Sequence, residues 1–113
     1  MSRSSEKLAE IIQREINDFL MREVEFPFDC LVTLTQVEVT SDLKQAFLQL
    51  SILPITKTSN ILKLVNRYVG RARHFLSKKL TLHQCPTLKF VVDDSALKNR
   101  KIEKALEELQ RGD

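Results

Sequence analysis

The sequence predicts an α+β fold, in which helices pack on one face of a three-stranded sheet. Residues 5–22 and 58–80 repeat apolar side chains at intervals of three and four, which is typical of helices with one buried face. Residues 31–39 are rich in β-branched side chains, residues 44–53 alternate, and residues 88–92 form a short apolar run, as strands do. The chain has 113 residues and 42% apolar residues, which suits one domain with a small core.

The first predicted helix covers residues 5–22, with Ser4 or Ser5 expected to cap its N-terminus. Its apolar stripe consists of Leu8, Ile11, Ile12, Ile16, Phe19 and Leu20. Residues 23–29 are a connector, because Pro27 discourages helix before it. Phe26 and Phe28 are expected to cover the core, and contact with a nucleic-acid base is the alternative.

Residues 31–53 are expected to form a two-stranded hairpin, with Ser41-Asp42 at its turn and Pro54 at its end. One side of the second strand carries Ala46, Leu48, Leu50 and Ile52, which should face the core. A third strand follows at residues 88–92. The amphipathic stretch 99–110, with Ile102, Leu106 and Leu109 on one side, predicts a C-terminal helix. We expect residues 1–113 to form a single domain, with frayed ends at residues 1–4 and 111–113.

The central helical stretch, residues 58–80, should begin at a Thr58 or Ser59 cap. Its apolar face contains Ile61, Leu62, Val65, Tyr68, Val69, Ala72, Phe75, Leu76 and Leu80. Gly70 costs about 1 kcal/mol there relative to alanine, which suggests a kink, a joint between two helices or a close backbone approach. That close approach is either RNA backbone or packing on the sheet. For Tyr68 the spacing favours a core position over stacking on a base.

The charges are distributed unevenly along the chain. The net charge is +3, yet residues 43–92 contain nine Lys and Arg and no Asp or Glu, whereas residues 1–42 have a net charge of −5. The polar side of the central helical stretch carries Lys63, Arg67, Arg71, Arg73, Lys78 and Lys79. A basic surface of this kind indicates polyanion binding. The competing interpretation is that the acidic first helix packs beside the basic one and neutralises it.

Other functions have less support in the sequence. No apolar run could span a membrane, and the first ten residues do not resemble a secretory signal, so we expect a cytoplasmic protein. Cys30, His74, His83 and Cys85 are metal-ligand types without a metal-site spacing, so we predict no metal, no cofactor and no enzymatic activity. Both cysteines are expected as buried thiols. Membrane binding by the basic helix is disfavoured because the core needs its apolar face.

Three segments resemble the bacterial ribosome-binding factor A family. Leu20-Met21-Arg22-Glu23-Val24 is similar to the end of the family's first helix, although Phe26-Pro27-Phe28 replaces its Asp-Pro-Arg turn. The most specific match is residues 32–51, VTLTQVEVTSDLKQAFLQLS, and residues 86–95, PTLKFVVDDS, resemble the last strand. The family has an Ala-x-Gly kink between two helices, and Tyr68-Val69-Gly70 stands at that place.

The resemblance implies a type II KH-like domain, with the order helix, strand, strand, two helices joined at a glycine kink, and strand. It also implies a monomeric small-subunit maturation factor that binds ribosomal RNA on the immature subunit, with no membrane and no small-molecule substrate. The expected RNA-binding residues are Lys63, Arg67, Gly70, Arg71, Arg73, Lys78 and Lys79. The alternative is a generic KH-like RNA-binding protein or a protein-interaction adaptor unconnected with the ribosome.

Overall fold

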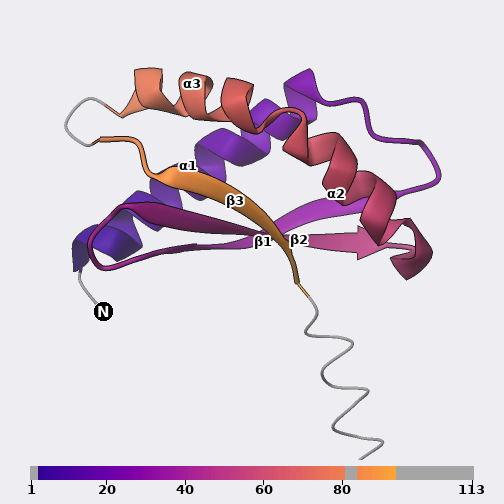
Figure 1. The fold of residues 1–113 in the computed structure, drawn as a ribbon, viewed down its shortest axis with the longest axis horizontal. Helices are drawn as coiled ribbons and strands as arrows, with labels where there is room; N and C mark the ends of the chain where they lie inside the picture. Colours follow the sequence, from indigo (N-terminus) through magenta and orange to yellow (C-terminus); the bar gives the residue numbers. More distant parts are fainter. Residues whose placement is uncertain (1–2, 81–83, 94–113) are drawn as a thin grey trace, which may run out of the picture.

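The computed structural model describes residues 3–80 and 84–93, and Figure 1 shows helices stacked against a single sheet. The α-helices are α1 (Arg3–Glu23), α2 (Thr58–Asn66) and α3 (Val69–Lys79), and a 3-10 turn, η1 (Ile55–Lys57), precedes α2. The strands are β1 (Leu31–Val39), β2 (Gln45–Leu53) and β3 (Thr87–Val92). The predicted α+β class is therefore confirmed. The predicted helix over 99–110 and the chain end at 111–113 lie outside the described residues.

The sheet has the order β1-β2-β3. β1 and β2 form the predicted antiparallel hairpin, whereas β2 and β3 are parallel, so that the helices α2 and α3 form the connection between them. All four predicted core side chains of β2 are buried: Ala46, Leu48, Leu50 and Ile52. They form one core with the buried faces of the three α-helices, which confirms the predicted inward side of this strand.

The core pattern of β1 depends on a β-bulge. Leu34 and Val37 are both buried, although an odd spacing places side chains on opposite faces of a regular strand. The pairing register shifts between Leu34 and Gln36, which leaves Thr35 as an extra residue and restores the inward direction. The Thr35 hydroxyl lies 3.2 Å from the Gln49 carbonyl oxygen and 2.8 Å from Asp93 Oδ2, so the bulge is tied to β2 and to the residue that follows β3.

The helix starts differ from the sequence predictions. α1 begins at Arg3, so Ser4 and Ser5 lie inside the helix, and Ser5 is buried instead of capping it. At α2 neither Thr58 nor Ser59 is the cap. The Thr58 hydroxyl donates a hydrogen bond of 2.7 Å to the Ile55 carbonyl, because the preceding η1 turn already supplies an acceptor at that position.

Two predictions of burial were wrong. Phe28 is fully exposed, since a turn closed by the Cys30 amide and the Pro27 carbonyl directs this segment away from the core, whereas Phe26 packs against it as expected. Cys30 and Cys85 are free thiols, as predicted, but both are only half-buried. Within the residues that the structure describes, every helix is too short or too polar to cross a bilayer.

Candidate nucleic-acid interface

The central helical stretch is broken at Arg67 and Tyr68, between α2 and α3. The predicted joint is therefore present, but Gly70 is the second residue of α3 and not the joint itself. Tyr68 is half-buried against the core, which agrees with the core interpretation of its spacing. The Arg71 guanidinium lies 5.0 Å from the centre of the Tyr68 ring, a cation–π distance that holds Arg71 beside the break.

All seven predicted site residues are exposed, but they do not form one cluster. Lys63 lies on α2, and Arg67 follows one helical turn later as the C-terminal cap of this helix. Arg71 and Lys78, with His74 between them, follow the outward stripe of α3, because spacings of three and four residues keep side chains on one face. The stripe borders a groove of about 470 Å³ against the end of α1, lined by Phe19, Glu23, Gly70, Arg71, His74, Phe75 and Lys78.

Arg73 points toward the other side of α3. Its Nη2 atom donates a hydrogen bond of 3.2 Å to the Cys85 carbonyl oxygen. Arg73 also lines a second hollow together with Lys44, which the sequence analysis did not single out. Only the fold brings these two cations together, because Lys44 belongs to the hairpin turn nearly thirty residues earlier in the chain. We therefore separate Arg73 from the stripe formed by Arg71 and Lys78.

Lys79 lies at the α1 side of α3. Its Nζ atom is 5.5 Å from the centre of the Phe75 ring, and the Arg22 guanidinium is 5.6 Å from the same ring. Phe75 in turn packs against Phe19 of α1 at 5.4 Å between ring centres. Arg22 was missed by the sequence analysis because it belongs to the acidic first helix, and no local pattern places it beside the basic one.

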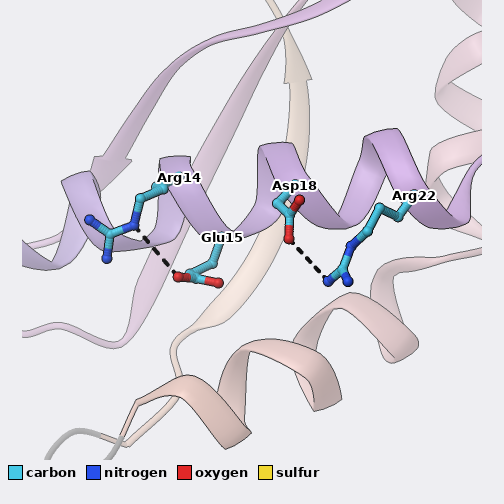
Figure 2. Close-up of polar contacts among 4 residues, drawn as sticks. All are labelled: Arg14, Glu15, Asp18 and Arg22. Carbon is cyan, nitrogen blue, oxygen red and sulfur yellow. Dashed lines mark ion pairs between the residues drawn. The ribbon is translucent and has the colours of Figure 1, made fainter.

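The ion pairs decide between the two interpretations of the basic stretch. α1 packs beside α3, yet two of its acids pair with cations of α1 itself: Glu15 with Arg14 at 3.6 Å and Asp18 with Arg22 at 3.0 Å (Figure 2). Within residues 3–80 and 84–93, the six predicted cations of the central helical stretch form no ion pair within 4.0 Å. Neutralisation by α1 is therefore wrong for the described structure.

Gly70 lies in open surroundings. A Cβ atom built on it would have no neighbour within 4 Å, so tight packing against the sheet does not explain this glycine. We expect Gly70→Ala to raise the free energy of unfolding by up to about 1 kcal/mol, since alanine is the better helix residue. Chemical denaturation measures this. A loss of stability would show that the glycine is required by the fold.

The cysteine and histidine residues do not assemble into a site in the described part of the chain. No group of three or more His, Cys, Asp and Glu there could hold a metal ion, and His83 lies outside the described residues. Burial raises the pKa of the Cys85 thiol, against the opposing effect of Arg73. Burial and the neighbouring Asp29 carboxylate raise the pKa of Cys30. Both shifts favour neutral thiols over thiolate ligands.

Fold and surface together define a class: a small α+β domain with a three-stranded sheet and a basic surface on two consecutive helices, whose cations form no ion pair among the described residues. The sequence comparison identifies the family within that class. The family described as "Ribosome-binding factor A" matches residues 4–106, which is most of the chain, and the protein belongs to this family.

Relatives and solved structures agree with this assignment. The chain is 32% identical to ribosome-binding factor A of Akkermansia muciniphila over 98% of this chain and 88% of the relative. It is 36% identical to that of Limosilactobacillus fermentum over 94% of this chain and 90% of the relative. The crystal structure of ribosome-binding factor A from Thermus thermophilus superposes with a TM-score of 0.65 at 17% identity, over 78% of this chain and 94% of that one.

A second neighbour is a homology model of Thermus thermophilus ribosome binding factor A, fitted into the cryo-EM map of a complex of that factor with 30S. It superposes with a TM-score of 0.60 at 17% identity, over 84% of this chain and 97% of that one. At such identities the structural likeness establishes a shared fold.

Proposed function

We propose that this protein is a maturation factor of the small ribosomal subunit, which binds ribosomal RNA on the immature subunit through the basic surface of α2 and α3. The observation that carries the proposal is the set of exposed cations on these helices without ion pairs in the described structure. Phosphate contacts from lysine and arginine supply most of the affinity in such complexes. The relatives bear the name ribosome-binding factor A, which favours the ribosome over an unrelated RNA or protein partner.

The finer description of the fold belongs to the same proposal. We propose that the domain is of the type II KH-like class, with the α2–α3 break in the place of the family's Ala-x-Gly kink; the element order from α1 to β3 supports this. We assign RNA contact to Lys63, Arg67, Gly70, Arg71, Arg73, Lys78 and Lys79. The stripe with Arg71 and Lys78 is the centre of this surface, and Arg73 contributes from the adjoining hollow. We further propose that the factor acts in the cytoplasm, as a monomer and without catalysis.

Co-sedimentation tests the proposed partner. The protein is mixed with purified small subunits, both immature and mature, and centrifuged through sucrose. We expect it to sediment with the immature subunits, and a protein of similar size and charge serves as the control. If it remains at the top of the gradient with both kinds of subunit at low salt, the proposed function is wrong.

The affinity for RNA should depend steeply on salt. If four of the exposed cations engage phosphates, the plot of log affinity against log salt concentration should have a slope of about −3, since each phosphate contributes about 0.7 to 0.9. Fluorescence anisotropy with a fragment of small-subunit RNA measures this slope. A flat dependence would contradict an interface formed by lysine and arginine.

A further inference from the structure

The groove between the end of α1 and the start of α3 combines three chemically different walls. Phe19 and Phe75 supply apolar surface, Arg71 and Lys78 supply positive charge, and Glu23 supplies a carboxylate. We propose that this groove binds a single unstacked guanine nucleotide of the RNA, with its phosphates on Arg71 and Lys78 and its base edge on Glu23. This inference rests on the proposed function and names the nucleotide that the same surface selects.

The groove is an open hollow of about 470 Å³, which leaves one side of a bound nucleotide exposed to solvent. Phe75 is half-buried and lines the groove, and Phe19 packs against it at 5.4 Å between ring centres. The Lys79 and Arg22 cations lie 5.5 and 5.6 Å from the centre of the same ring. Gly70 contributes no side chain to the wall, and the space beside it is open. RNA-binding proteins place unstacked bases of loops and bulges against such aromatic surfaces.

The cations at the rim of the groove are the proposed contacts for the RNA phosphates. Arg71 is fixed beside the α2–α3 break by its contact with Tyr68, and Lys78 lies two helical turns further along the same stripe. Neither side chain has an ion-pair partner among the described residues. The groove can thus receive backbone phosphates on its α3 side while a base turns toward α1.

Glu23 is the acidic residue among those that line the groove. It is exposed, makes no ion pair within the described part of the chain, and stands at the C-terminal end of α1, where the helix dipole disfavours a negative charge. A carboxylate also repels phosphate. The two oxygens of a carboxylate can, however, accept two neighbouring hydrogen bonds. Guanine presents N1–H and N2–H as adjacent donors, whereas adenine and cytosine offer an amino group beside an acceptor, and uracil offers one N–H between two carbonyls.

The arrangement fits a guanine nucleotide. Such a nucleotide carries negative charge at one end and a pair of hydrogen-bond donors at the other. The groove is lined by two cations of α3 and by the carboxylate at the end of α1, so it offers a partner to each end.

Three short oligouridylate probes that differ only at the central position test this inference. One probe carries a single central guanosine, a second is all uridine, and a third is abasic at the centre. We expect the guanosine probe to bind the full-length protein at least about fivefold more tightly than the other two, which is the lower end of the discrimination by a bidentate base contact. In Glu23→Ala this ratio should fall to near one, while binding of the uridine probe is unchanged or stronger.

Glu25→Ala is the matched control, because it removes the same charge from an exposed residue that does not line the groove. It should keep the preference for guanosine. The inference is overturned if the wild-type protein binds all three probes equally, if Glu23→Ala retains the ratio, or if small subunits bind but no probe does. In each case the proposed function stands. If the protein binds neither the probes nor the small subunits, the proposed function itself is wrong.

Discussion

Leu48→Ala is expected to lower the free energy of unfolding by about 3 kcal/mol, within the range of about 2–5 kcal/mol for leucine truncation in a core. Leu48 is completely buried in the middle strand, where it pairs with Val37 of β1 and Phe90 of β3. Removing its side chain leaves a cavity in the core. β1 and β3 both pair with β2, so neither strand can move in to fill this cavity. Urea denaturation followed by circular dichroism measures the loss.

Leu31→Ala is the matched control for this substitution. Leu31 lies in the adjacent strand, and 62% of it is exposed. The same chemical change there should cost well under about 1 kcal/mol, as exposed substitutions do. Equal losses in the two variants would mean that the inward side of the sheet has been assigned to the wrong face.

Arg71→Glu together with Lys78→Glu should weaken binding to small-subunit RNA at least about tenfold, which corresponds to about 1.4 kcal/mol. Both residues lie on the exposed stripe of α3, and the substitution replaces two phosphate-binding cations by repelling carboxylates. The fold should persist, because exposed charges contribute little to stability. Anisotropy titration measures the affinity, and circular dichroism verifies the fold.

The control reverses two cations on α1 at the same spacing, Lys7→Glu with Arg14→Glu. Both residues are exposed, and the variant changes the net charge by the same amount. We expect this control to lose much less affinity than the α3 variant. Equal losses would show that net charge governs binding, and full affinity in both variants would show that the site is misplaced.

Several features of the fold follow from local sequence patterns. The types of α1, β1, β2, α2, α3 and β3 were all predicted, because apolar periods of 3.6 and 2 are properties of consecutive residues. The inward side of β2 follows from the same alternation, as the burial of Leu48 and Leu50 confirms. The basic stretch without acidic residues can likewise be identified from the sequence alone. A joint within residues 58–80 was also predicted, but its position was not, since Gly70 lies inside α3.

Other features could not be predicted from apolar and charge patterns alone. The bulge at Thr35 could not be derived from β1 alone, because its register is defined by pairing with β2. The acids of α1 could not be assigned to partners before the structure showed that Glu15 and Asp18 pair within their own helix. The exposure of Phe28 depends on the local turn that directs it outward, since its hydrophobicity alone favours burial.

The sequence by itself determined that this protein has an amphipathic α+β core and a basic helical surface, since both are encoded within single segments. Only the tertiary structure decided how that surface is divided. It placed Glu23 and Phe19 of α1 against Arg71 and Lys78 of α3, and it directed Arg73 toward Cys85 instead. The physical reason is that helical periodicity fixes the side of a helix on which a residue lies, whereas the packing of helices on the sheet selects the neighbours which that side meets.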